Sequence, residues 1–293
     1  MVVPDNARPD DLRGALEKMR AALHHRGPDD RGTFWHEGAR VGLANCRLSI
    51  RDLTPAGHMP MCAEEVCITY NGEIYNADAL RRELSDLGHA FDSHSDTEVI
   101  LRGYLEWRHD VVRRLRGMFA FAIFDAAERS LLLARDPLGI KPLYYSQTAP
   151  FCFASELRAF TAGRLVSHVI DDVALSAYLQ LGSIPAPLTI YRDIAALPPG
   201  HLAHLRLGDD QLRQRRYWSL ATENPETATV PDVKTALVEA VASHLVSDVP
   251  VGAFLSGGLD SSTVVALAMR ESGQPLRTCS IAFESRAYGE SGY

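Results

Sequence analysis

Hydrophobic residues follow a helical spacing near the start of the chain and a strand-like spacing soon afterwards. Apolar side chains recur every three to four positions within residues 11–23, which predicts an amphipathic helix. The next stretch, HHRGPDDRG, ends this helix because Pro28 disfavours helical backbone at Gly27. Short apolar runs then alternate with polar, glycine-containing segments, which is typical of strands joined by turns.

These apolar runs predict a set of strands with two helices among them. The predicted strands are Thr33–Trp35, Val41–Ile50, Val66–Tyr70, Met118–Asp125, Leu131–Arg135 and Phe151–Ala154. One helix covers about residues 77–88, and a second begins at Ser95, where Ser95 and Glu98 form a capping-box pattern. Strands, then helices, then more strands predict an α+β fold of layered sheets and helices.

The character of the chain changes near residue 221. The polar stretch ATENPETATVPD has two prolines and is typical of a linker. After it the pattern predicts a helix at 232–246 and a buried strand at Val249–Leu255. A glycine-rich loop, a helix at 260–272 and a strand at Leu276–Phe283 follow. This order predicts the start of a parallel, nucleotide-binding α/β sheet.

We therefore expect three regions. Residues 1–205 form the first domain, and residues 206–231 form a connecting segment. Residues 232–293 form the N-terminal part of an α/β domain. A parallel sheet needs several βα units to cover both of its faces, so we expect this second domain to be truncated.

Composition and charge exclude several classes of function. The chain has 293 residues, a formal net charge of −7 and no long basic run, which argues against binding to nucleic acid or to an anionic membrane. No apolar stretch is long enough for a membrane span, and the first residues do not form a secretory signal. The five scattered cysteines predict reduced, mostly buried thiols in a cytoplasmic protein.

The loop SGGLDSS at residues 256–262 has the chemistry of a phosphate site. Gly257 and Gly258 let the backbone turn tightly and approach an anion, and the helix that follows offers free N–H groups. Serine hydroxyls add donors, and Asp260 could hold Mg²⁺. The loop lacks the lysine of a Walker A motif, and Phe254 replaces the first glycine of a nucleophile elbow. The plain alternative is a glycine turn into a capped helix.

In full, this loop resembles the pyrophosphate loop (PP-loop) of the N-type ATP pyrophosphatases, and SDVPVGAFLSGGLDSS resembles asparagine synthetases in particular. The resemblance implies ATP as a substrate and Mg²⁺ as a cofactor. It implies that Leu255 and Ile281 contact the base and sugar of ATP. The residues that it implies for the pyrophosphate end are Ser256, Gly257, Gly258, Asp260 and Ser261.

The first 205 residues carry a second set of motifs. They include HRGPDD, RLSIRDL, AGHMPM, YNGEIYN, SDTEVI, LRGMFAFAIFD, ARDPLGIKPLYY and FASELRAF. In this order and spacing they resemble the class II glutamine amidotransferase domain of glutamine-hydrolysing asparagine synthetases. The resemblance implies an Ntn-hydrolase-like fold, with antiparallel sheets layered between helices.

Residue types in these motifs suit free glutamine. Arg47 can grip the α-carboxylate with two hydrogen bonds, while Glu73 and Asp96 can accept from the α-ammonium. The Asn71 side chain and the Gly72 N–H can form an oxyanion hole. Each position also has a plain structural explanation. Arg47 suits a strand end, Asn71–Gly72 alone favours a hairpin turn, and Asp96 suits a helix cap. Arg135-Asp136-Pro137 is expected to be a structural turn.

The nucleophile of this family does not appear at the expected position. In the family it is a cysteine directly after the initiator methionine, whereas residue 2 here is Val2. Cys46 precedes Arg47, so on a strand its side chain is expected to face the opposite side. Without a thiolate no acyl-enzyme can form, and we expect the polypeptide 1–293 not to hydrolyse glutamine. Either the sequence is a fragment, which we prefer, or the nucleophile is lost.

For the intact protein the resemblance implies asparagine biosynthesis from aspartate, ATP and glutamine through a β-aspartyl-adenylate, giving asparagine, AMP, pyrophosphate and glutamate. A homodimer is a candidate assembly. Two alternatives stay open. One is an adenylating synthetase or cyclase of the β-lactam-synthetase type without glutaminase activity, and the other is a non-catalytic glutamine-binding module.

Overall fold

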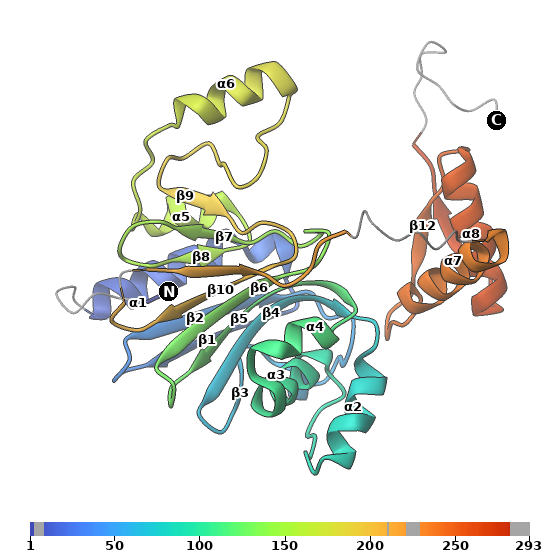
Figure 1. The fold of residues 1–293 in the computed structure, drawn as a ribbon, viewed down its shortest axis with the longest axis horizontal. Helices are drawn as coiled ribbons and strands as arrows, with labels where there is room; N and C mark the ends of the chain where they lie inside the picture. Colours follow the sequence, from blue (N-terminus) through green and yellow to red (C-terminus); the bar gives the residue numbers. More distant parts are fainter. Residues whose placement is uncertain (3–8, 210, 221–228, 282–293) are drawn as a thin grey trace. The chain divides into compact units, whose positions relative to one another are not determined.

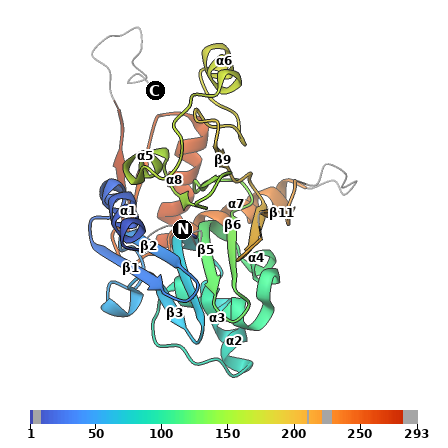
Figure 2. The same ribbon diagram turned by 90° about the vertical axis from the view of Figure 1, so that its left-hand side faces the viewer.

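The computed structural model describes residues 1–2, 9–209, 211–220 and 229–281. The chain divides into two compact units, Met1–Leu220 and Ala221–Tyr293. Figures 1 and 2 show the helices and strands from two directions, and each unit is described by itself. Among the described helices, none combines the length and apolar character that crossing a membrane requires.

A six-stranded antiparallel sheet forms the centre of the first unit, with the strand order β11-β10-β6-β5-β4-β3. Its strands are β3 (Met61–Ala63), β4 (Val66–Ile74), β5 (Gly117–Asp125), β6 (Ser130–Arg135), β10 (His201–Arg206) and β11 (Arg213–Arg216). The central strands are buried on both faces, because helices cover one face and further strands cover the other. The sheet extends past residue 205, where the sequence analysis ended the first domain.

A second layer of strands lies over one face of this sheet. It consists of two antiparallel sheets, β1-β2 and β8-β7-β9. Their strands are β1 (Asp30–His36), β2 (Val41–Arg47), β7 (Tyr144–Ser146), β8 (Phe153–Ala154) and β9 (Ile194–Ala196). Val2 forms β-bridges with both Val41 and Phe151. Apolar residues from both layers, including Leu43, Phe124 and Leu133, form the cluster between them.

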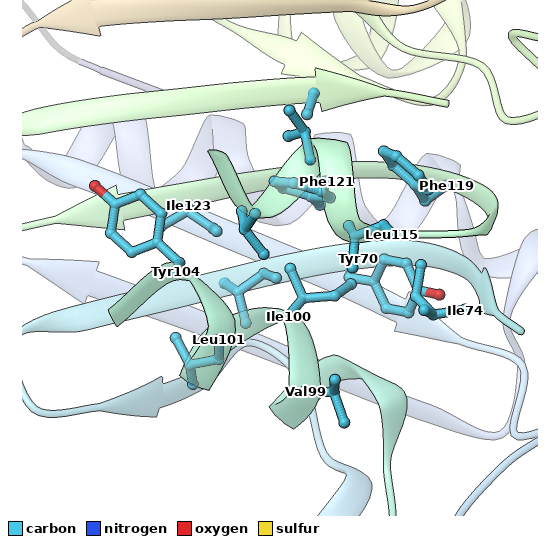
Figure 3. Packing of buried hydrophobic residues seen from close by; sticks show 14 of the residues in the cluster. Tyr70, Ile74, Val99, Ile100, Leu101, Tyr104, Leu115, Phe119, Phe121 and Ile123 are labelled. Carbon is cyan, nitrogen blue, oxygen red and sulfur yellow. The ribbon is translucent and has the colours of Figure 1, made fainter. Parts of the chain in front are cut away.

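Helices cover the outer faces of both strand layers (Figures 1 and 2). They are α1 (Pro9–Ala22), α2 (Ala77–Asp86), α3 (Asp96–Trp107), α4 (Val111–Arg114) and α5 (Leu157–Gly163). Helix α6 (Asp172–Leu181) projects away from the strand layers, and most of its residues are exposed (Figure 1). In Figure 3, Ile100 and Tyr104 of α3 point toward Phe121 and Ile123 of β5, as expected for an amphipathic helix on a sheet. Helices α1 and α5 pack on the second strand layer. The first unit is therefore the α+β arrangement of antiparallel sheets between helices that the sequence predicts.

The second unit contains two helices and a short parallel sheet. Its elements are α7 (Val230–His244), β12 (Gly252–Phe254), α8 (Leu259–Ser272) and β13 (Arg277–Cys279). Strands β12 and β13 pair in parallel, and α8 connects them. Thr229 and Asp232 form a capping box at the start of α7. Many of its large apolar side chains are exposed, including Phe254 at 79% and Leu259 at 83%.

The structure decides between the alternatives for Asn71–Gly72 and changes one local expectation. Asn71–Gly72 does not form the hairpin turn that the pair alone would favour, since both residues pair with β5 within β4. The Ser95 side chain does cap α3, but Glu98 accepts from Asp92 and Ser93 rather than from the Ser95 N–H.

The expectation of reduced thiols is wrong for Cys62 and Cys67. The antiparallel register places these two residues opposite each other on β3 and β4, where they form a disulfide. Spacing alone did not show this, because the pairing depends on the position of the turn between the two strands.

Candidate functional site

A single cavity of about 290 Å³ in the first unit brings together the residues predicted to bind glutamine. Its wall includes Arg47, Asn71, Gly72, Glu73 and Asp96. They come from the end of β2, the second half of β4 and the first turn of α3. Residues up to 49 positions apart in the sequence therefore meet in one place.

Arg47 is a buried guanidinium held by backbone groups. It is only 7% exposed, and its Nη2 donates to the carbonyl oxygens of Arg51 at 2.9 Å and Asp52 at 2.6 Å. A Cβ on Gly57 would lie 2.1 Å from the same nitrogen, so a larger residue there would displace the guanidinium. The loop after β2 thus fixes the guanidinium in place. Such a group can bind a carboxylate with two parallel hydrogen bonds.

Asp96 lies at the start of α3 and is almost fully buried. Its Oδ2 accepts hydrogen bonds from the Tyr70 hydroxyl at 2.8 Å and from the Ile74 N–H at 2.9 Å. Burial raises the pKa of the Asp96 carboxyl, and these two hydrogen bonds oppose that effect. The carboxylate is therefore oriented by β4, and a cationic ligand group would stabilise its charge.

Residues 71–73 of β4 supply the remaining polar groups. Alternation along the strand places Asn71 and Glu73 on one face. The Asn71 Nδ2 is buried, and no described residue accepts a hydrogen bond from it. A Cβ on Gly72 would lie 2.2 Å from the Met118 carbonyl oxygen, so close packing against β5 requires glycine. An unused amide donor on a cavity wall suits an oxygen that gains negative charge.

The SGGLDSS loop in the second unit connects β12 to α8. Gly257 has φ of 82°, which favours glycine, and the Ser256 and Ser261 hydroxyls lie 3.1 Å apart. Gly258 is the N-cap of α8 and provides no side chain to cap the first turn. The N–H groups at the start of α8 are therefore without a side-chain partner from the cap, which favours an anion there.

The other residues predicted for ATP lie near this loop. Leu255 pairs with the end of β13, since its N–H donates to the Cys279 carbonyl oxygen at 2.9 Å and its own carbonyl accepts from Ser280 at 2.6 Å. Ile281 follows directly and is 77% exposed. Asp260 is exposed in the first turn of α8. A lone carboxylate beside hydroxyls suits Mg²⁺ only together with phosphate oxygens. Within the described ranges no cluster of three or more metal-ligating side chains occurs.

Comparison with known families assigns the first unit. Residues 4–218 match the glutamine amidotransferase domain. The chain belongs to the glutamine amidotransferase domain family. Residues 232–293 match a second family, asparagine synthase. The resemblance predicted from the motifs is thereby confirmed for both parts of the chain.

Curated relatives extend beyond the matched region. The chain is 39% identical to Asparagine synthetase [glutamine-hydrolyzing] 3 of Bacillus subtilis, covering 92% of this chain and 45% of that protein. It is 37% identical to Putative asparagine synthetase [glutamine-hydrolyzing] 2 of Methanocaldococcus jannaschii, covering 96% and 59%. The chain thus spans about half the length of the curated relatives it matches.

A solved structure supports the fold. Glutamine phosphoribosylpyrophosphate amidotransferase from B. subtilis aligns with a TM-score of 0.54 and 16% identity, covering 99% of this chain and 67% of that chain. At this identity the likeness concerns the fold alone. It agrees with the Ntn-type layering of sheets and helices in the first unit.

Thiols near the cavity of this amidotransferase domain are not activated. Cys46 is among the residues that line the cavity. Its Sγ donates to the Arg20 carbonyl oxygen at 3.2 Å, and burial raises its pKa. Burial likewise raises the pKa of Cys152 to about 11. A raised pKa keeps a thiol protonated and therefore poorly nucleophilic.

Many other residues line the cavity without having been predicted from the sequence, and two polar ones among them are Asn45 and Lys141. The Asn45 Nδ2 donates to Thr69 and Tyr70, whereas its buried Oδ1 accepts no hydrogen bond from the described residues. Lys141 belongs to the ARDPLGIKPLYY motif, which contributed to the family resemblance, but only its Arg135-Asp136-Pro137 segment was given a role, as a structural turn. No spacing rule indicated that this lysine would reach a cavity built around β4.

The Arg135-Asp136 pair explains how Lys141 reaches the cavity. The fully buried Asp136 carboxylate accepts hydrogen bonds from four backbone N–H groups, which belong to Phe119, Leu138, Ile140 and Lys141. The Arg135 guanidinium donates to three carbonyl oxygens, which belong to Gly139, Lys141 and Leu197. Two neighbouring side chains therefore fix the loop at 136–141, since Asp136 accepts from its N–H groups and Arg135 donates to its carbonyl oxygens.

Proposed function

We propose that the first unit binds free glutamine in the cavity around β4, and that the intact protein uses glutamine as the amido donor for asparagine synthesis. The observation that carries this proposal is the meeting of Arg47, Asn71, Glu73 and Asp96 on one cavity wall. The names of the relatives and the asparagine synthase match support the second half of the proposal.

The cavity suits a zwitterionic amino acid that ends in an amide. Arg47 binds the α-carboxylate through the guanidinium edge that the loop leaves free. The α-ammonium donates to Asp96, with Glu73 as the second carboxylate available to it. Asn71 Nδ2 and the Gly72 N–H stabilise the oxyanion that forms when the amide carbon is attacked.

The second unit supplies the start of the synthetase site in this proposal. The loop from Ser256 to Ser261 binds the pyrophosphate end of ATP, with Leu255 and Ile281 beside the base and sugar. Asp260 would hold Mg²⁺, whose charge would balance the phosphate oxygens. In the intact protein the aspartate β-carboxylate displaces pyrophosphate from ATP, and ammonia then displaces AMP from the adenylate to give asparagine.

Hydrolysis requires a thiolate that the described cysteines do not offer. We therefore expect the polypeptide 1–293 to bind glutamine without releasing ammonia. A glutamine-binding module without hydrolysis is the second candidate function, and the raised thiol pKa of Cys46 favours it. The cytoplasmic location and the homodimer stay predictions.

Calorimetry with glutamine, run beside an ammonia-release assay on the same polypeptide, tests this proposal. The expected result is saturable binding, abolished in Arg47→Ala, with no ammonia above a Cys46→Ala control. Absence of binding in the wild type would contradict the proposal. Ammonia release that Cys46→Ala removes would instead identify Cys46 as a nucleophile.

A further inference from the structure

Two histidines, His109 and His204, contact each other at the surface of the first unit. Their ring centroids are 4.8 Å apart, and the ring planes are tilted by 56°. His109 belongs to the 3-10 turn η3 (Arg108–Asp110) that follows α3, whereas His204 belongs to β10. Both side chains are half-buried, and neither lines the cavity around β4. The proposed function therefore leaves this pair without a role.

The neighbouring residue Arg108 holds His109 in this position. Arg108 has φ of 52°, a backbone conformation that persists in non-glycine residues only where the surroundings hold it. Its Nη1 donates to the buried Asp125 carboxylate at 3.0 Å, and the Tyr104 hydroxyl donates to the same oxygen at 3.1 Å. The turn that brings His109 to β10 is thus anchored in the core.

Strand register places three arginines on the same face as His204. In the antiparallel pair of β10 and the edge strand β11, His204 lies opposite Arg213, and Leu202 lies opposite Arg215. Opposite residues share a face, and Leu202 marks it as the face that packs against α3. Arg206, two residues after His204, has the same orientation. The arginines and the histidine pair therefore lie on one face at the edge of the sheet.

The ring nitrogens of His109 and His204 form no hydrogen bond with any described residue. Other histidines of the first unit differ in this respect, since His25, His58 and His89 each pair with a carboxylate. Two half-buried imidazoles that face each other and lack acceptors are an unfavourable arrangement when either is protonated.

The charges that face the two imidazoles are mainly positive. Burial is the largest effect and lowers the pKa of both histidines, and they also repel each other as cations. The arginines that lower the pKa further are Arg108, Arg206, Arg213 and Arg215. The carboxylates that raise it are Asp110, Asp209 and Glu128.

Ion pairs leave part of this positive charge uncompensated. Asp110 lies 3.8 Å from Arg113, and Asp209 lies 3.8 Å from Arg213. Among the described residues no carboxylate lies within ion-pair distance of Arg206 or Arg215. Charged residues on an edge strand hinder pairing with other chains, which accounts for the arginines of β11. It does not account for the half-buried histidine pair beside them.

We propose that His109, His204 and the three arginines Arg206, Arg213 and Arg215 form a binding site for a phosphate group. Guanidinium groups present paired N–H donors that match phosphate oxygens, and protonated imidazoles add further donors. The bound anion would remove the repulsion between the cations, so the histidines take up protons as it binds. None of these residues lines the cavity proposed for glutamine, and the inference does not depend on that function.

An NMR titration of the histidine side chains in the full chain tests the site, with inorganic phosphate and, separately, with AMP. We expect saturable shifts at His109 and His204 and none at His58 or His89. Equal affinities would identify free phosphate as the ligand, and tighter binding of AMP would identify a phosphate ester. Shifts at all four histidines that grow linearly with anion concentration would show screening by salt only and would overturn the proposal.

Substitutions test the assigned residues. Arg215→Gln changes an exposed side chain on the edge strand, and it should weaken phosphate binding by about tenfold without affecting folding. His204→Gln should weaken it similarly. The matched control is Arg192→Gln, which removes an exposed arginine paired with Asp172 and should leave the affinity unchanged. Wild-type affinity in both Arg215→Gln and His204→Gln would contradict the assignment.

The pH dependence of anion binding tests the role of the histidines. Sulfate is the probe because it keeps its charge between about pH 8 and about pH 6, where imidazoles gain protons. Its affinity should rise by about threefold or more over this range in the wild type, and by less in His204→Gln. An affinity for sulfate that does not change with pH in the wild type would overturn the part assigned to the imidazoles.

Discussion

The cavity proposed to bind glutamine and the SGGLDSS loop are built in opposite ways. The cavity residues come from three separate elements, are buried or half-buried, and include Arg47 and Asp96, which are held by hydrogen bonds to backbone groups of other elements. The loop residues are consecutive in sequence, exposed, and bonded mainly to one another. Binding residues in the cavity are therefore also core residues, whereas those in the loop can change with little effect on folding.

The sharpest test of this contrast is Gly72→Ala. Its new Cβ would meet the Met118 carbonyl oxygen at 2.2 Å, within a paired strand that cannot shift freely. We expect a loss of about 3 kcal/mol in the free energy of unfolding, together with loss of glutamine binding. Denaturant titration and calorimetry measure both effects.

Gly14→Ala is the matched control. Gly14 lies in α1, and a Cβ there would meet nothing within 4 Å. Alanine should stabilise this helix by about 0.5–1 kcal/mol. If both alanine variants behaved alike, the close packing of Gly72 against β5 would be wrong.

Arg47→Lys should come next in size. Lysine keeps the charge but loses the planar group that fits between the Asp52 carbonyl and Gly57. We expect glutamine binding to weaken by about a hundredfold, with a smaller change in stability. A variant that binds as tightly as the wild type would show that a point charge suffices for the carboxylate.

Asp96→Asn should separate binding from stability. The folded-state pKa of Asp96 is raised, so ionising this carboxyl costs stability as the pH rises from its unfolded value through its folded one. The asparagine variant should gain on the order of 1 kcal/mol near neutral pH and bind glutamine about tenfold more weakly. Thermal unfolding across pH 4 to 8 checks the first effect. A variant that is less stable at neutral pH would contradict it.

Glu98, two residues further along α3, should have the opposite effect on how stability depends on pH. Burial by itself raises its pKa, but hydrogen bonds from Ser93 and Asp92 lower it overall. The stability it contributes is present above the unfolded pKa and is lost as the pH falls through the folded one. Glu98→Gln should therefore lose stability near neutral pH and show a flatter acid profile. The difference in stability from the wild type should therefore change with pH in opposite directions for Asp96→Asn and Glu98→Gln.

The smallest structural effect should come from Ser261→Ala in the loop. Among the described residues, this hydroxyl forms hydrogen bonds with Ser256 and Gly258 of the same loop. Stability should change by less than about 0.5 kcal/mol, whereas the affinity for Mg²⁺–ATP, measured by calorimetry, should fall severalfold. A destabilisation as large as that of Gly72→Ala would remove the contrast between the two sites.

The sequence predicted the layered fold because motif order and hydrophobic spacing survive in a single chain. The residues that it grouped for glutamine share one cavity wall, and their binding role stays a prediction. Asn71–Gly72 taken alone favours a turn, but pairing with β5 keeps it extended. The sequence failed where the outcome depends on contacts with residues elsewhere in the chain. The Cys62–Cys67 disulfide depends on strand register. Lys141 reaches the cavity only because Arg135 and Asp136 fold its loop, which no local pattern records.

That same loop offers an attachment point. Its backbone forms hydrogen bonds with the side chains of Arg135 and Asp136. The side chains of Leu138 and Ile140 are 70% and 52% exposed and do not form part of the core. A fluorescent dye attached at residue 138 should leave the lysine backbone unmoved. The dye would lie a few residues from the cavity wall, so a change in its fluorescence could report the binding of an amino acid. This readout does not require the protein to catalyse a reaction.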